Sequence, residues 1–157
     1  MKVLLAGIGN VFLGDDGFGV EVARRLRGVP VPDGVTVADF GVRGVHLAYE
    51  LLDGYDAAVL VDALPRGGPP GTVYVVEPAT DPDSVPAMDA HAMTPDTVLA
   101  LLATLGGTLD RVVVVGCEPA DIGEGMGLSA PVAAAVDRAA AEALAVARDL
   151  VDGNGKG

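Results

Sequence analysis

The chain has 157 residues, half of them hydrophobic, with one cysteine and a formal net charge of −12. This length suits one domain, and so acidic a surface repels phosphate backbones and anionic lipid head groups, which excludes nucleic acid and membranes as expected partners. One cysteine forms no intramolecular disulfide and no run of about 20 apolar residues occurs, so we expect a cytoplasmic protein.

The first half of the chain alternates short apolar runs with helical patterns. Apolar runs at Lys2–Ala6, Val35–Asp39 and Ala57–Asp62 predict buried strands. Between them, apolar residues recur at helical spacing, which predicts helices over Phe18–Arg27 and Val45–Leu52. This order of elements is typical of a parallel sheet covered by helices.

The fourth strand breaks this pattern. Only residues 63–71 separate Ala57–Asp62 from the next apolar run, Thr72–Val76. Parallel neighbours need a connection of about a dozen residues or more, so we expect the fourth strand to run antiparallel to the third.

The second half of the chain completes a three-layer α/β/α sandwich with a mixed five-stranded sheet. Residues 77–93 predict a long loop, and Thr94-Pro95 predicts the N-cap and first residue of a helix. Arg111–Gly116 predicts the fifth strand, and Ser129 starts the last helix, which runs to about Val151. We expect one domain over residues 1–151 and a disordered tail over residues 152–157.

Candidate site residues lie on the loops that follow the strands, where open α/β sheets bind ligands. Asp15 and Asp16 follow the first strand, Asp62 ends the third, and His91 lies on the long loop. Adjacent side chains point in different directions, so one aspartate can cap the next helix and leave the other available. Asp16, Asp62 and His91 would form an incomplete set of ligands for a divalent transition metal, with positions open for a substrate.

A nucleotide site is the weaker alternative. Gly7 and Gly9 match a dinucleotide fingerprint only in part, because position 12 is Phe12. Asp39 resembles a ribose-binding acid, but two carboxylates at the start of the first helix would repel a pyrophosphate.

Two further residues are interpreted as structural. Cys117 ends the fifth strand and suits a small buried hydrophobe, since a thiol nucleophile would need His91 as its base. His46 lies on the second helix and is interpreted as a structural or surface residue.

In these segments the sequence resembles the hydrogenase maturation proteases, endopeptidases that trim the C-terminal extension of the large subunit of nickel–iron hydrogenases. The matching pieces cover nearly the whole chain: GIGN and DDGFGV within residues 7–20, DFGVRG at 39–44, VDA at 61–63, the histidine of DAHAMTP at 89–95, and VGCEP and GLSAPV within 115–132.

The resemblance implies a phosphorylase/hydrolase-like sheet whose antiparallel fourth strand lies on the edge beside the fifth. The metal-binding residues of the family match Asp16, Asp62 and His91, and the resemblance implies that nickel already in the precursor is recognised. Two departures bear on substrate choice: Asp89 stands where Ser or Thr is common, and Phe40-Gly41-Val42 stands where Gly-Gly-Thr is common.

The sequence therefore predicts a nickel-dependent, aspartic-type endopeptidase that removes the extension of the large-subunit precursor after nickel insertion. Asp16, Asp62 and His91 are its expected catalytic and metal-binding residues, with one of the carboxylates activating water as a general base. We expect the Ni²⁺ to come with the substrate, and Zn²⁺ or Cd²⁺ to replace it in a crystal. The alternatives are a non-enzymatic nickel-checkpoint chaperone for the same precursor and a nucleotide-binding domain.

Overall fold

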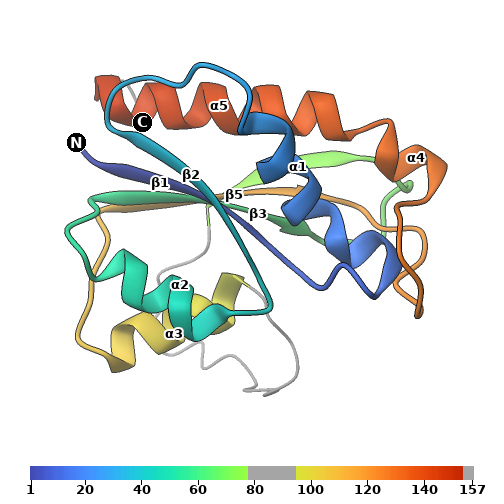
Figure 1. Ribbon diagram of the computed structural model, residues 1–157, viewed down its shortest axis with the longest axis horizontal. Coiled ribbons are helices and arrows are strands. Elements are labelled where there is room, and N and C mark those ends of the chain that lie inside the picture. The colour runs from blue at the N-terminus through green and yellow to red at the C-terminus, as the bar shows by residue number, and fades with distance from the viewer. Residues whose placement is uncertain (78–94, 154–157) are drawn as a thin grey trace.

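The computed structural model describes residues 1–77 and 95–153, which form a sheet between two layers of helices (Figure 1). The strands are β1 (Val3–Ile8), β2 (Val35–Gly41), β3 (Ala57–Ala63), β4 (Val73–Val76) and β5 (Arg111–Cys117). The helices are α1 (Phe18–Leu26), α2 (Gly44–Leu51), α3 (Pro95–Thr104), α4 (Ala130–Ala133) and α5 (Val136–Asp152), with a 3₁₀ turn η1 (Gly14–Gly17) before α1. The last predicted helix is therefore two helices, α4 and α5.

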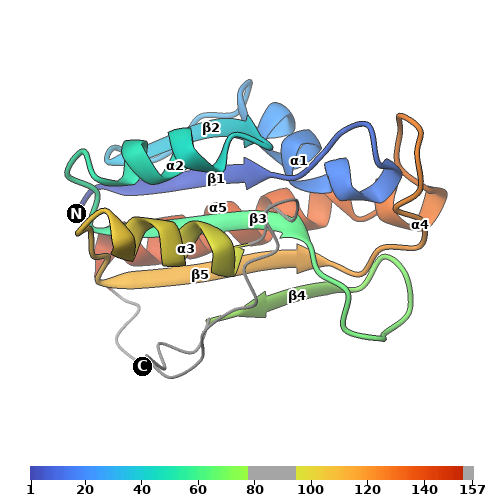
Figure 2. The same ribbon diagram turned by 90° about the horizontal axis from the view of Figure 1, so that it is seen from below.

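The sheet has the strand order β2-β1-β3-β5-β4. Strands β1, β2, β3 and β5 pair in parallel, whereas β4 pairs antiparallel with β5 at the sheet edge (Figure 2). The antiparallel direction predicted from the short connection after β3 is confirmed, and so is the mixed five-stranded α/β sheet.

The central strands are buried on both faces, and alternate residues serve the two helix layers. Val3 and Leu5 of β1 belong to the core cluster that contains α1 and α5, while Leu4 and Ala6 belong to the cluster that contains α2 and α3. This alternation follows from the two-residue period of a strand and explains the continuous apolar runs of the sequence.

The parallel strands end at one edge of the sheet, which brings their following loops together. Gly7 of β1 pairs with both Asp39 of β2 and Val61 of β3, and Asp62 pairs with Gly116 of β5. The acids predicted from the sequence therefore lie at this edge, the usual ligand-binding edge of open α/β sheets.

The expected tail falls mainly outside the described residues. Helix α5 ends at Asp152, and residues 154–157 are not among those described, so the division into a domain and a tail stays a prediction. Of the described helices, none is both long enough and apolar enough to cross a membrane.

Candidate active site

Asp62 is a buried acid at the carboxyl end of β3. Its side chain is 3% exposed, and its Oδ1 accepts a hydrogen bond of 2.8 Å from the backbone N–H of Ala63. Burial raises the pKa of the Asp62 carboxyl well above its usual range, and the nearby Asp16 carboxylate raises it further. An ionised Asp62 is therefore costly unless a cation compensates it.

Asp16 lies on the η1 turn, at the same edge as Asp62. Its Oδ2 accepts a hydrogen bond of 2.9 Å from the N–H of Asn10. Gly9 lies close to both residues: a Cβ built on it would approach the backbone oxygen of Asp16 to 1.9 Å and Oδ1 of Asp62 to 3.2 Å. With φ at 130°, this position also has a backbone conformation that favours glycine, so the turn after β1 lets both acids approach it closely.

The neighbouring Asp15 is fully buried and has a different role. Its carboxylate accepts hydrogen bonds from the N–H groups of Ala120, Asp121 and Ser129 and from the Ser129 hydroxyl, at 2.7–2.9 Å. Burial alone raises the pKa of Asp15, but the N–H donors of Asp121, Ser129 and Ala120 outweigh it and hold the pKa below its usual value. Asp15 thus ties η1 to the loop after β5.

Glu118, which the sequence analysis did not select, fixes the loop after β3. Its Oε1 accepts hydrogen bonds from the N–H groups of Arg66 and Gly68, at 2.8 and 3.0 Å, and from the Tyr74 hydroxyl at 2.8 Å. Burial raises the pKa of Glu118, but these donors lower it by more, so that the net shift is downward. The sequence feature that could have identified Glu118 is its position immediately after a buried apolar run, like that of Asp62.

Cys117 is buried, in agreement with its interpretation as a small hydrophobe. Burial, with a smaller contribution from the negative charge of Asp15, raises the pKa of the thiol to about 11. A neutral, buried thiol is a poor nucleophile near pH 7.

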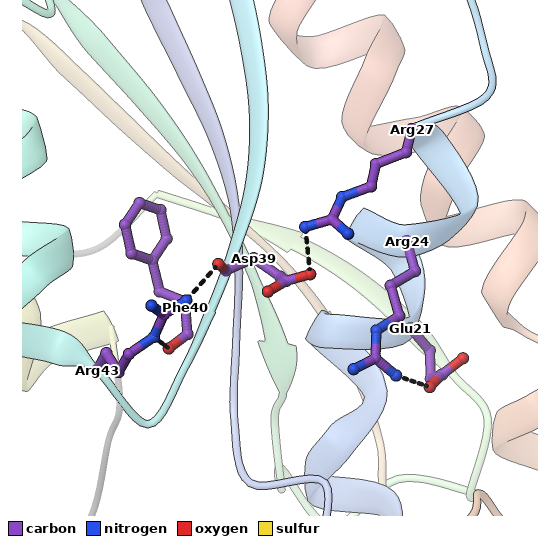
Figure 3. Close-up of polar contacts among 6 residues, drawn as sticks. All are labelled: Glu21, Arg24, Arg27, Asp39, Phe40 and Arg43. Carbon is purple, nitrogen blue, oxygen red and sulfur yellow. Dashed lines mark hydrogen bonds and ion pairs between the residues drawn. The ribbon is translucent and has the colours of Figure 1, made fainter.

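Asp39 lies at the end of β2 and is engaged by arginines (Figure 3). Its carboxylate pairs with Arg27 of the α1 end at 2.8 Å, and its backbone oxygen accepts a hydrogen bond of 3.3 Å from Arg43. Arg43 also donates to the backbone oxygen of Phe40 at 3.1 Å. These bonds give Asp39 a structural role in joining β2 to α1.

The third predicted metal ligand, His91, lies outside the described residues. Within residues 1–77 and 95–153, no three His, Cys, Asp or Glu side chains are grouped so that they could hold a metal ion. The described part brings two of the predicted ligands, Asp16 and Asp62, to the Gly9–Asn10 turn, and the three-ligand site stays a prediction.

Comparison with known proteins identifies the family. The sequence model for hydrogenase maturation proteases of the HycI type matches residues 20–146. The chain belongs to the hydrogenase maturation protease family. The family resemblance and the fold class predicted from the sequence are both confirmed, and membership favours an endopeptidase over a checkpoint chaperone or a nucleotide-binding domain.

Two curated relatives and one solved structure show how far the similarity to hydrogenase maturation proteins extends. The hydrogenase expression/formation protein HupD of Rhizobium leguminosarum bv. viciae is 32% identical over 151 residues, which cover 94% of this chain and 74% of HupD. HupM of Azotobacter chroococcum mcd 1 is 35% identical over 148 residues, covering 92% of this chain and 70% of HupM. The hydrogenase maturating endopeptidase HybD of E. coli matches with a TM-score of 0.77 and 27% identity, over 95% of this chain and 93% of HybD.

Proposed function

We propose that this hydrogenase maturation endopeptidase removes the C-terminal extension of the large-subunit precursor of a nickel–iron hydrogenase after nickel insertion, and so activates the hydrogenase. The observation that carries the proposal is that Asp16 and Asp62 both lie against the Gly9–Asn10 turn. Family membership supplies the reaction class, and the two acids supply the chemistry.

The chemistry of these two carboxylates fits a divalent metal ion. One oxygen of each carboxylate is bonded to a backbone N–H, namely Oδ2 of Asp16 and Oδ1 of Asp62. The other oxygen of each receives no hydrogen bond from residues 1–77 or 95–153, so it is available as a ligand, with His91 as the proposed third. The burial and mutual repulsion of the acids would be relieved by Ni²⁺ that the precursor carries, which makes nickel-loaded precursor the preferred substrate.

The proposed reaction is hydrolysis of one peptide bond. Asp16 or Asp62 acts as general base and accepts a proton from the attacking water. The water oxygen bonds to the scissile carbonyl carbon, the C–N bond breaks, and the leaving nitrogen takes up a proton. Binding the precursor through its nickel holds that carbonyl near the acids, which lowers the entropic part of the barrier. A chain with one cysteine suits action in the cytoplasm.

Mass spectrometry of the precursor tests this proposal. Wild-type protein should shorten nickel-loaded precursor and leave metal-free precursor intact. Asp62→Asn and His91→Ala should each lower the cleavage rate by about 100-fold or more, the range typical of a lost acid–base or binding group. The matched control is Asp39→Asn, at the same sheet edge but paired with Arg27, which should cleave within a few-fold of wild type. Precursor that binds but stays intact would favour the checkpoint chaperone instead.

A further inference from the structure

Two loops beside the candidate active site expose large apolar side chains. Phe12 is 63% exposed, Ile122 is 55% exposed and Met126 is 73% exposed. We call these three residues the apolar rim. Single exposed apolar residues are ordinary, but three on two adjoining loops, in a chain with a net charge of −12, indicate a surface that meets another protein.

The two loops that carry the apolar rim are joined through their backbones. Gly125 accepts a hydrogen bond of 2.7 Å from the N–H of Gly14 and donates one of 2.9 Å to the oxygen of Phe12, and the N–H of Asp15 donates to Asp121 at 2.8 Å. The loops run side by side at the same end of the molecule in both views (Figures 1 and 2). Gly125, with φ at 142°, has a conformation that favours glycine. A rim fixed in this way loses little conformational entropy when a partner binds.

A groove of about 420 Å³ adjoins the apolar rim. Its apolar lining includes Val11, Met126 and Leu128, and it also contains Gly14 and Gly17, the two ends of the η1 turn that carries Asp16. The groove therefore borders the same η1 turn as the candidate active site. It has room for one or two apolar side chains of a partner.

The charged walls of the groove are already compensated within the chain. Arg24 pairs with Glu21 at 3.2 Å (Figure 3), and Arg25 pairs with Asp137 at 2.6 Å. The loops themselves, residues 8–17 and 119–127, contain Asp121 and Glu124 but no Lys or Arg. The rim thus presents apolar side chains surrounded by negative charge, which complements an apolar patch bordered by basic residues.

We infer that the apolar rim and its groove dock the folded body of the nickel-loaded precursor, at a surface separate from the extension that is cut. The inference rests on the proposed function. The hydrogen bonds connect the two sites: Phe12 donates from its N–H to the side chain of Asn10, and Asn10 donates from its own N–H to Asp16. A partner bound to Phe12 is therefore held next to the carboxylates. This raises the local concentration of its extension at the site.

Steady-state cleavage of nickel-loaded precursor tests the docking surface. The double variant Phe12→Ser/Met126→Ser should raise KM by about tenfold or more, as expected when two large interface side chains are lost, and leave kcat within about twofold. The matched control is Val45→Ser/Tyr49→Ser, which changes one aliphatic and one aromatic exposed residue of α2. It should leave KM within about twofold. All four side chains are exposed, so both variants should keep the melting temperature of wild type.

A competition experiment separates docking of the body from binding of the extension. Processed large subunit, which lacks the extension, should compete with precursor for wild-type protein and about tenfold less well for the apolar-rim variant.

If wild type cleaves precursor and the apolar-rim variant keeps the wild-type KM, the docking inference is wrong while the proposed function stands. If the α2 variant alone raises KM, the docking surface is α2. If wild type leaves precursor intact, the proposed function fails, and direct titration of precursor against both proteins still decides whether the rim binds it.

Discussion

Asp15 and Asp16 are neighbours in the chain, but their carboxylates bond to different parts of the molecule. Asp15 accepts N–H groups from Ala120, Asp121 and Ser129, more than 100 residues away, whereas Asp16 accepts the N–H of Asn10. Asp15 is saturated by donors and fully buried, so it stabilises the loop after β5. The other oxygen of Asp16 receives no hydrogen bond from residues 1–77 or 95–153, and we propose that it acts together with Asp62. Asp15 therefore has a structural role, whereas Asp16 is the residue proposed for catalysis.

Short-range patterns were sufficient to predict the fold class, whereas the edge position of β4 beside β5 came from the family resemblance. The two-residue and helical periods of the apolar residues located the strands and helices, and the short segment after Asp62 set the direction of β4. These features depend on residues close together in sequence, which is why they can be read locally. The break between α4 and α5 was not predicted, because residues 132–135, where it occurs, contain no proline or glycine that would mark it.

The roles of the acids could not be derived in the same way. Asp62 and Glu118 both follow apolar runs, yet within the described residues Glu118 has three donors around one oxygen and Asp62 has the single N–H of Ala63. That difference arises from loops that only the folded chain brings together. The helix cap considered for one of the two aspartates is not formed: in the described structure no side-chain hydrogen bond caps η1 or α1, because Asp15 bonds to the distant loop instead.

Removing the Asp15 carboxylate should strongly destabilise the protein. Asp15→Ala removes the buried acceptor of three backbone N–H groups, so the free energy of unfolding should fall by about 3 kcal/mol. Ser129→Ala, which removes one of the four bonds, should cost about 1 kcal/mol. Urea denaturation at pH 7 measures both.

Because the pKa of Asp15 is lowered by folding, its contribution to stability is present above the usual value of 3.8 and is lost as the pH falls below it. Asp15→Asn should therefore lose less stability than wild type between pH 7 and pH 3.

The Glu118–Tyr74 hydrogen bond should be visible in the titration of Tyr74. Its bond to Glu118 raises the pKa of the Tyr74 hydroxyl above 10.0. Glu118→Gln should move that pKa back toward 10.0, because the negative charge that opposes ionisation is removed. NMR titration of ¹³C-labelled tyrosine measures the change, and loss of the signal in Tyr74→Phe assigns it. Tyr55, whose pKa is raised by burial, is the internal control and should not move.

Cys117 should be unreactive in the folded protein and dispensable for cleavage. With a pKa of about 11, very little of the thiol is ionised at pH 8, so iodoacetamide should modify native protein on the order of 100-fold more slowly than urea-unfolded protein. Cys117→Ala should cleave nickel-loaded precursor within a few-fold of wild type. Loss of cleavage in a folded variant would restore a thiol mechanism.

General protease activity should be absent. A site that depends on nickel carried by its substrate gains nothing from an ordinary peptide, because neither the compensating charge nor the positioning is supplied. Incubation with casein, with and without added Ni²⁺, should yield no new peptides by mass spectrometry over a period in which nickel-loaded precursor is fully processed. Release of casein fragments that depends on Asp62 would contradict recognition through bound nickel.

Neutralising Asp62 should stabilise the metal-free protein while abolishing its response to metal. Burial and the charge of Asp16 both raise the pKa of Asp62, so its ionised form opposes folding, and this penalty grows as the pH rises through the usual carboxyl range. Asp62→Asn removes the charge and keeps the shape, so without metal at pH 7 its melting temperature should exceed that of wild type by about 2–4 °C, the shift expected for about 1 kcal/mol in a domain of this size. Added Ni²⁺ or Zn²⁺ should raise the melting temperature of wild type but not of Asp62→Asn, Asp16→Asn or His91→Ala. Asp39→Asn should respond to metal as wild type does, since Arg27 already compensates that carboxylate. If all of these proteins respond alike to metal, the assignment of Asp16, Asp62 and His91 as the metal site is wrong.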